Sequence, residues 1–350
     1  MTWIHHKHKL YTRKKSFVTT IIGGFFMIRW GIIGTGNIAN QFAEDFKFVK
    51  KGRLVGVASR TKTKAELFAK KYDIENSYNS YEALLQEPSI DIVYIATPHT
   101  FHKTHTILAL NHNKHVLCEK PFAVNKNEVD EMIQLAKKKN LFLMEAMWMV
   151  FQPVFKKVQE WVNQDKIGRI KTLKAEFGFK PPYDLDSRLF NINLAGGTLL
   201  DTGIYPLTLA LYLYDKNPSD IQAMASIGKS KVDEQLSVNL KFDEDQLAIL
   251  STTFMSKYKD DAFIYGEKGH IHIPNFWYSK VAYLVTPNET IEYKNNTPVF
   301  GYAWEVEHVN QMLMDNRTES NIVTFEKSEK VINNMDLIRE QIGLKYPFES

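Results

Sequence analysis

The strongest constraint on the fold is a regular alternation of strand and helix patterns between residues 27 and 146. Short apolar runs such as IRWGIIG and DIVYIA are typical of buried strands, and stretches with helical spacing follow them. One helix is indicated by Ile38, Phe42 and Phe46, which share one helical face. Such alternation predicts a doubly wound parallel sheet, in which ligands bind at the carboxyl ends of the strands.

Capping patterns support two of the predicted helices. Thr63 and Glu66 have the spacing of a capping box at the start of TKTKAELFAKKY, and Asn125 precedes Glu128 in the same way before EVDEMIQLAKKK. We therefore expect Thr63 and Asn125 to lie at helix N-termini.

The first strand ends in a glycine-rich loop, GTGNIA, at residues 34–39. This is a G-x-G-x-x-A pattern: Gly34 permits a tight turn, Gly36 lets the backbone approach a pyrophosphate, and Ala39 allows close helix packing. Free N–H groups at the helix N-terminus attract the pyrophosphate. The loop predicts an α/β Rossmann domain that binds a dinucleotide, although a glycine turn kept only for packing is the alternative. The predicted cofactor contacts here are Gly34, Thr35, Gly36, Asn37 and Ile38.

The end of the next strand indicates which dinucleotide is bound. NAD sites usually place an acidic residue there, to bind the ribose 2′-hydroxyl. This strand ends in Ser59 and Arg60, and Lys64 follows closely. A hydroxyl and a guanidinium would bind the 2′-phosphate that an acidic residue repels. NADP is therefore favoured over NAD, and the alternative is that Arg60 stacks on the adenine and accepts either cofactor.

Histidines follow the strand that ends at Thr97 and Pro98. His99, His102 and His105 are three residues apart, a spacing that zinc ligands can have. On a helix this spacing spreads the side chains over a broad face, and no cysteine or aspartate cluster joins them. We expect no metal, and we expect His99 and His102 to line the nicotinamide side of the site together with Thr97 and Pro98.

The segment HVLCEKPF, residues 115–122, ends another strand with an acid, a lysine and a proline. Lysine is usually a surface residue, but here it stands at the ligand edge of the predicted sheet. A residue that precedes proline avoids the helical region, so Lys120 should stay extended and point toward the nicotinamide.

Together these motifs resemble the glucose–fructose oxidoreductase, inositol dehydrogenase and MocA (Gfo/Idh/MocA) family. The resemblance rests on GTGNIA, ASR, IATPHTFH and CEKPF, and on AGGTLLDTGIYPL at residues 195–207, where Tyr205 replaces the family's histidine. MEAMWMVFQP and IREQIGLKYPFE are similar to dimeric dihydrodiol dehydrogenases and NADP-dependent D-xylose dehydrogenases. The resemblance covers residues 27–350.

The resemblance implies roles for residues around CEKPF. Lys120 matches the catalytic lysine, Glu119 precedes it near the nicotinamide ribose, and the bond before Pro121 is expected to be cis. Trp148 matches an aromatic residue near the nicotinamide and the substrate. The subgroup often has arginine after this tryptophan, whereas this chain has Val150, so we do not assume the subgroup's usual substrate.

Asp201 and Tyr205 are four residues apart and share one helix face. The resemblance implies that Asp201 lies on the substrate side and that Tyr205 acts with the lysine. The alternative is that Asp201 interacts with the helix dipole and that Tyr205 belongs to the core.

The implied reaction is the reversible oxidation by NADP⁺ of a hydroxyl on a sugar, polyol or diol. Lys120 is a candidate base, because burial beside a positive nicotinamide would favour its neutral form. Tyr205 is the other candidate, with Lys120 holding its phenolate. Asp201 would orient the substrate hydroxyl, and aromatic residues would cover the sugar ring. These aromatic residues are Trp148, Phe151 and Phe177.

A non-catalytic, NADP-sensing regulator on the same fold is the rival interpretation, since a fold does not fix a function. Keeping both Lys120 and Tyr205 argues against it, because a sensor does not need a proton-transfer pair.

Residues 147–350 are predicted to form an α+β domain that binds substrate. Alternating runs such as IKTLKAEFGF, QLSVNLKF and HIHIP, with few helices between them, predict a mostly antiparallel open sheet. An apolar outer face of such a sheet needs a partner, so we expect a homodimer. A final helix over residues 326–342 should pack back on the first domain.

Composition narrows the possible partners and surroundings. The net charge of +4 comes from five basic residues within 1–26, so the rest gives no support to nucleic-acid binding. No apolar run is long enough to span a membrane. Cys118 is the one cysteine, which agrees with a cytoplasmic protein.

Residues 1–26 are basic and then apolar, like a signal peptide, but the apolar run enters the first strand without a small-residue cleavage site. We expect Met27 to be the natural start and the extension to be a start-site artefact or a disordered tail.

Overall fold

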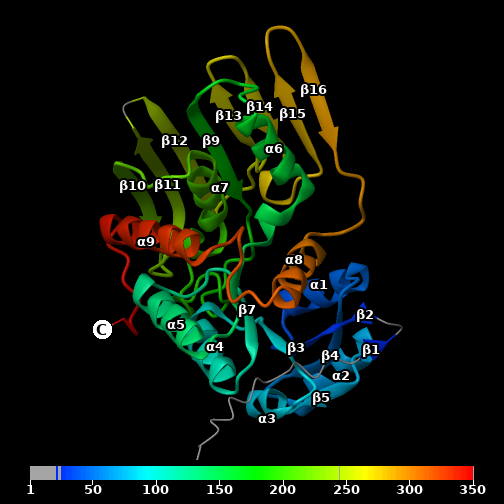
Figure 1. The fold of residues 1–350 in the computed structure, drawn as a ribbon. Helices are drawn as coiled ribbons and strands as arrows, with labels where there is room; N and C mark the ends of the chain where they lie inside the picture. Colours follow the sequence, from blue (N-terminus) through cyan, green and yellow to red (C-terminus); the bar gives the residue numbers. More distant parts are fainter. Residues whose placement is uncertain (1–20, 23–24, 244, 350) are drawn as a thin grey trace, which may run out of the picture.

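Two β-sheets organise the computed structural model, which describes residues 21–22, 25–243 and 245–349 (Figure 1). One sheet is parallel and the other mostly antiparallel, which confirms the predicted fold class. The expectation for residues 1–26 falls largely outside the described residues. Within that stretch, β1 (Ile21–Ile22) and β2 (Phe25–Phe26) pair antiparallel.

The parallel sheet forms because its strands are apolar on both faces and helices cover both sides. In the order across the sheet, its strands are β5 (Asn76–Tyr78), β4 (Gly52–Ala58), β3 (Ile28–Ile33), β6 (Ile92–Ile95), β7 (His115–Glu119) and β8 (Leu143–Ala146). Its helical segments are α1 (Asn37–Asp45), η1 (Phe46–Phe48), α2 (Lys62–Tyr72), α3 (Tyr81–Gln86), η2 (His99–Phe101), α4 (His102–Asn111) and α5 (Lys126–Lys139). The edge strand β5 was not predicted, because three polar or half-buried residues give no apolar signal.

Helix capping agrees with one prediction and not with the other. Asn125 caps α5, since its Oδ1 accepts a hydrogen bond from the Glu128 backbone N–H at 3.0 Å. The predicted cap at Thr63 is wrong, because the helical backbone already begins at Lys62 and Thr61 is the extended residue before it.

The second sheet is open and holds one parallel pair, β12 with β9. In the order across the sheet, its strands are β10 (Asp220–Ile227), β11 (Asp233–Phe242), β12 (Gln246–Thr253), β9 (Ile170–Gly178), β13 (Ala262–Gly266), β14 (His270–Ile273), β15 (Val281–Val285) and β16 (Thr290–Lys294). Its helical segments are η3 (Trp148–Phe151), α6 (Pro153–Asn163), η4 (Ile192–Leu194), η5 (Leu199–Gly203), α7 (Ile204–Tyr214), η6 (Phe276–Tyr278), α8 (Tyr302–Met314) and α9 (Phe325–Gln341). Strands β15 and β16 extend the sheet beyond the predicted set.

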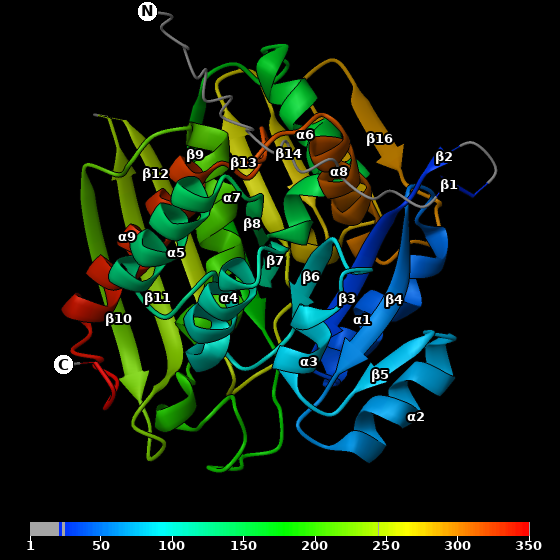
Figure 2. The same ribbon diagram turned by 60° about the horizontal axis from the view of Figure 1, so that its bottom comes forward.

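Two late helices join the sheets. Helix α8 lies against α1 (Figure 1). The Trp30 Nε1–H of β3 donates to Asn310 Oδ1 of α8 at 2.9 Å. Helix α9 lies beside α5 (Figure 2), and Asp336 Oδ2 accepts from the Lys126 N–H at 2.8 Å. The carboxyl ends of the parallel strands therefore face the segment that leads into α7. In the part of the chain that the structure describes, no helix is long and apolar enough to cross a membrane.

Candidate active site

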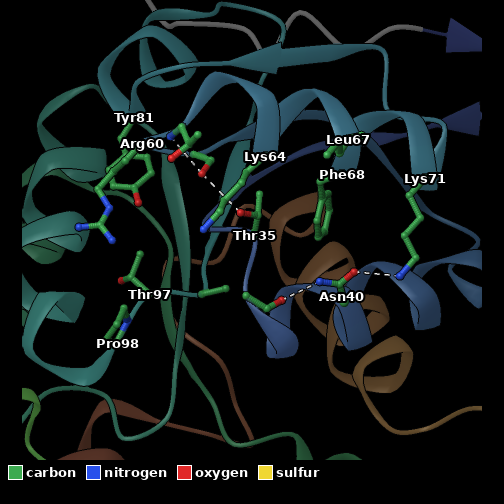
Figure 3. Close-up of a pocket in the computed structure, with 15 residues that line it drawn as sticks. Thr35, Asn40, Arg60, Lys64, Leu67, Phe68, Lys71, Tyr81, Thr97 and Pro98 are labelled. Carbon is green, nitrogen blue, oxygen red and sulfur yellow. Dashed lines mark hydrogen bonds between the residues drawn. The ribbon is translucent and has the colours of Figure 1, made fainter. Parts of the chain in front are cut away.

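A cavity of about 530 Å³ lies at the carboxyl ends of β3, β4 and β6 (Figure 3). It brings together the glycine loop, the end of the second strand and the segment after β6, as the strand-end rule predicts. The lining residues include most of the predicted cofactor contacts, namely Gly34, Thr35, Gly36, Ser59, Arg60, Lys64, Thr97 and Pro98.

The two positions of the loop require glycine for different physical reasons. Gly34 has a φ of +106°, and a Cβ there would stand 2.7 Å from the Ala96 carbonyl oxygen, so only glycine is tolerated. Gly36 has an ordinary φ of −77°, and a Cβ there would meet no atom within 4 Å. Packing within the protein therefore does not explain Gly36, and the open space at the N-terminus of α1 is what a pyrophosphate would need.

Three basic side chains line the part of this cavity beside α2. Lys64 extends toward the Thr35 loop, and Arg60 lies beside Tyr81 (Figure 3). Lys71 also lines the cavity and donates to Asn40 Oδ1 at 3.0 Å. The sequence analysis missed Lys71, although it stands two turns after Lys64 on the same helix face.

The CEKPF segment is held by buried hydrogen bonds. The Lys120–Pro121 bond is cis, as the family resemblance implied. Glu119 accepts hydrogen bonds from the Tyr94 hydroxyl and from the Lys120 N–H, and burial raises its pKa to about 7. Glu145 Oε1 accepts from the Phe122 N–H at 3.0 Å. The turn that carries Lys120 is therefore fixed on both sides.

Lys120, Asp201 and Arg188 form what we call the charged cluster. Lys120 Nζ donates to the Asp201 carbonyl oxygen at 2.7 Å and lies 3.6 Å from Asp201 Oδ1. Arg188 Nη1 donates to the same Oδ1 at 2.9 Å. Burial opposes ionisation of Asp201, but Arg188 and Lys120 overcome this effect and hold its pKa well below the usual range. Asp201 is therefore a permanent carboxylate.

Tyr205 lies next to Lys120 of the charged cluster. Lys120 Nζ stands 4.8 Å from the centroid of its ring, a cation–π contact, while the hydroxyl accepts from Trp148 Nε1 at 3.1 Å. Burial and the neighbouring Glu119 raise the Tyr205 pKa well above its usual value, so the hydroxyl is protonated. In this structure Lys120 thus contacts the ring face, whereas a lysine that holds the phenolate oxygen was one of the two predicted arrangements.

The element that carries Asp201 begins with a π-helical turn, η5, and continues as α7. Such turns are frequent at functional sites. Asp233 fixes the start of η5, because its Oδ2 accepts from Thr198 Oγ1 at 2.8 Å and from the Leu199 N–H at 2.7 Å. Gly197 is needed here, since a Cβ would clash with Asp233 Oδ1. No pattern in the sequence indicates the role of Asp233.

Aromatic rings surround Tyr205 and Trp148. Phe177 stacks on Trp277 with centroids 4.7 Å apart, and Trp148 lies 6.0 Å from Trp277 and 5.3 Å from Phe300. Phe177 and Trp148 were predicted, whereas Trp277 and Phe300 come from a stretch without a motif. The structure therefore gathers an apolar wall beside the charged cluster.

The predicted aromatic residue Phe151 and the neighbouring Val150 are both buried. Phe151 contacts His308, with centroids 4.9 Å apart, and Val150 is packed in the core.

The histidines have different surroundings. The two ring nitrogens of His102 lie 2.7 Å from the Pro121 carbonyl oxygen and 2.8 Å from that of Thr97, so His102 links the two loops. His99 is buried, and burial, followed by the charge of Arg188, keeps its pKa well below the usual value. Among the described residues, no group of three His, Cys, Asp or Glu side chains is arranged to hold a metal ion.

Comparisons with known proteins agree with this architecture. Residues 28–147 match an oxidoreductase family with an NAD-binding Rossmann fold, and residues 155–272 match the Gfo/Idh/MocA C-terminal domain. The trans-1,2-dihydrobenzene-1,2-diol dehydrogenase of Xenopus laevis is 36% identical over 91% of this chain and 99% of its own length. That of Mus musculus is 34% identical over 91% of this chain and 98% of its own.

Solved structures share the fold. An aldose-aldose oxidoreductase from Caulobacter crescentus has a TM-score of 0.83 at 24% identity, covering 90% of this chain and 97% of its own. A 3-ketoreductase from Actinomadura kijaniata, solved with NADP and TDP-benzene, has a TM-score of 0.81 at 21% identity, covering 90% of this chain and 98% of its own.

The buried Asp233 predicts a pH dependence of stability. Burial raises its pKa from 3.8 to about 7, so between these values the unfolded chain ionises Asp233 while the folded chain keeps the proton. The folded state therefore loses stability as the pH rises from about 3.8 to about 7, by on the order of 4 kcal/mol. Asp233→Asn should remove this loss, measured by urea unfolding from pH 4 to pH 8.

The exposed Asp220→Asn is the matched control and should follow the wild type. Parallel wild-type and Asp233→Asn curves would show that Asp233 is ionised in the folded protein.

Proposed function

Because the chain belongs to the Gfo/Idh/MocA oxidoreductase family, we propose that it transfers a hydride reversibly between NADP and the carbon of a hydroxyl on a sugar, polyol or diol. The observation that carries this proposal is the charged cluster, which is buried beside the protonated Tyr205. The diol dehydrogenases to which the chain is similar support the substrate class. The single cysteine, Cys118, is consistent with work in the cytoplasm.

The glycine loop and the segment Thr97–Pro98 would hold a nicotinamide cofactor, which would supply or accept the hydride. In this proposal the Asp201 carboxylate accepts a hydrogen bond from a substrate hydroxyl next to the reacting one and so orients the substrate. The Tyr205 hydroxyl gives its proton to the substrate oxygen during reduction and takes it back during oxidation. Lys120, fixed by the Asp201 carbonyl, stabilises the negative charge that develops on the tyrosine and substrate oxygens. Lysine as the direct base is the alternative role.

The surrounding aromatic wall has two functions in this proposal. Phe177, Trp277 and Trp148 present flat apolar faces, which suit the C–H face of a sugar or diol ring. They also exclude water, which strengthens the electrostatic effect of Lys120 on the reacting oxygen.

The free-energy cost of burying the charges of Lys120 and Asp201 argues against a non-catalytic sensor. Lys120 and Asp201 both have side chains only 10% exposed, and removing charges from water is expensive unless they serve a purpose. Cofactor sensing alone does not require such a pair next to a tyrosine.

Replacing Lys120 by methionine tests the catalytic proposal. Lys120→Met should lower kcat by about 10²–10⁴-fold on any substrate found in a panel of pentoses, hexoses, inositols and diols. NADPH binding, measured by fluorescence titration, should change little. The control Lys103→Met removes a lysine that pairs with Glu131 on the surface and should keep full activity. Unchanged turnover in Lys120→Met would refute the role, and cofactor binding without turnover on the whole panel would favour the sensor.

The choice of NADP over NAD rests on Arg60 and Lys64. Hydrogen bonds to a charged group contribute about 1.5–3 kcal/mol each, so Arg60→Ala with Lys64→Ala should weaken NADPH binding by roughly 10²-fold or more. NADH binding should change far less, because NADH has no 2′-phosphate. Lys62→Ala, on the same helix but outside the cavity, is the control. Equal weakening of both cofactors would support the stacking role of Arg60 instead.

We also propose that two copies pair through the outer face of the eight-stranded sheet. Exposed apolar side chains lie on its strands, including Leu247 and Ile249 on β12, and a ring stack joins Phe263 to His272 and Tyr283. Ile249 lies opposite Asn239 and Lys174 on the neighbouring strands, near the middle of this face. A single chain would leave this apolar surface in water.

Sedimentation should therefore give twice the chain mass of 40.6 kDa. Ile249→Lys should produce monomers, because its charge would be buried opposite Lys174 without an anionic partner. Leu337→Lys, on the exposed side of α9, should remain dimeric. A monomeric wild type would contradict the proposed pairing.

A further inference from the structure

Arg188 is the exposed member of the charged cluster. Its side chain is 52% exposed, whereas those of Lys120 and Asp201 are each 10% exposed. A guanidinium carries five N–H donors. Among the described residues, the Nη1–H bond to Asp201 Oδ1 is the one hydrogen bond that the Arg188 guanidinium makes. The remaining donors are therefore available to a ligand beside Asp201.

The backbone of Arg188 is held in place by its loop. On one side, the Tyr183 hydroxyl donates to Glu234 Oε1 at 2.7 Å. On the other side, Phe190 is buried and packs on Phe254 with centroids 5.6 Å apart. The Phe190 N–H also donates to the Ser187 carbonyl oxygen at 3.1 Å and closes a turn around Arg188. A pre-positioned side chain loses less entropy when it binds a ligand.

The charges of the cluster do not balance. Lys120 and Arg188 both approach Asp201 Oδ1, so one carboxylate serves two cations. Glu119 offsets the excess only in part, because burial raises its pKa to about 7 and leaves it partly protonated near neutral pH. His99 adds no negative charge, and the nearby walls are aromatic. An anion next to Arg188 would compensate the excess positive charge.

We propose that Arg188 binds an anionic oxygen group of the substrate, a carboxylate or a phosphate, so that the enzyme prefers acidic sugars to neutral ones. This inference rests on the proposed function and names the substrate class of the same site. The guanidinium fork matches either group through two parallel hydrogen bonds, which a lysine does not offer. The competing explanation is that Arg188 only neutralises Asp201, and in that case its loss would affect acidic and neutral substrates equally.

The test is a binding measurement on the complete chain loaded with NADPH. Calorimetric titration with D-glucose, D-glucuronate and D-glucose 6-phosphate compares a neutral ring with a carboxylate and a phosphate on the same ring. We expect one anionic sugar to bind at least about tenfold more tightly than glucose, a difference of about 1.4 kcal/mol. Whichever anion is favoured identifies the group that Arg188 recognises.

Three variants connect this preference to Arg188. Arg188→Gln should reduce the anion preference to below about twofold, and Arg188→Lys should retain part of it, because the charge remains without the fork. Arg169→Gln is the matched control: Arg169 is 46% exposed and also pairs with aspartates, but it precedes β9, at the end of that strand opposite Phe177. It should keep the full preference.

The inference is overturned if wild type binds the three sugars equally or binds none of them. It is also overturned if Arg188→Gln weakens all three to the same extent. Turnover measurements distinguish a failure of the proposed function from a failure of the anion site. Turnover of neutral substrates without an anion preference would leave the oxidoreductase function intact. An anion preference without turnover on any substrate would leave the anion site intact and refute the function.

Discussion

The contact between Lys120 and Asp201 is the interaction on which the site depends. Lys120 follows a strand of the parallel sheet, and Asp201 belongs to the segment that leads into α7 beside the second sheet. Lys120 Nζ contacts both the carbonyl and the carboxylate of Asp201, so one residue fixes the position of the ammonium group. Neither charge would remain buried without the other. The two halves of the molecule therefore share one electrostatic centre, and it forms only when both sheets are correctly placed.

Buried carboxyl groups fix the backbone around this centre. Glu119 and Glu145 hold the residues on either side of Pro121, and Asp233 holds the start of the π-helical turn. Burial raises the pKa of each to about 7, so in the folded protein these groups are mostly protonated only below that pH. Each of them accepts hydrogen bonds from backbone N–H groups that secondary structure leaves unpaired. The rigidity of the site thus comes from polar groups whose hydrogen bonds are worth more in a dry environment.

Residues in local patterns were predictable from the sequence, and residues that act across the fold were not. The glycine loop, the Asn125 cap and the CEKPF turn depend on neighbours a few residues away, so their spacing predicts their structure. Trp277 meets Phe177 only because β9 and η6 come together in space, and Asp233 reaches Leu199 across 34 residues. The capping prediction at Thr63 failed because a spacing rule cannot tell which of two nearby threonines ends the extended backbone.

At two positions of the site, contacts within the protein do not explain the residue that is found there. Gly36 has ordinary backbone angles and open space where a side chain would fit. Among the described residues, the N–H donors of Arg188 have no protein acceptor other than Asp201. Elsewhere in the site, buried groups such as Glu119 and His102 use their polar atoms within the fold. Space without a side chain and donors without acceptors are what a binding site needs before its ligand arrives. We propose that Gly36 leaves room for the pyrophosphate of the cofactor and, by the same reasoning, that Arg188 binds the charged end of the substrate.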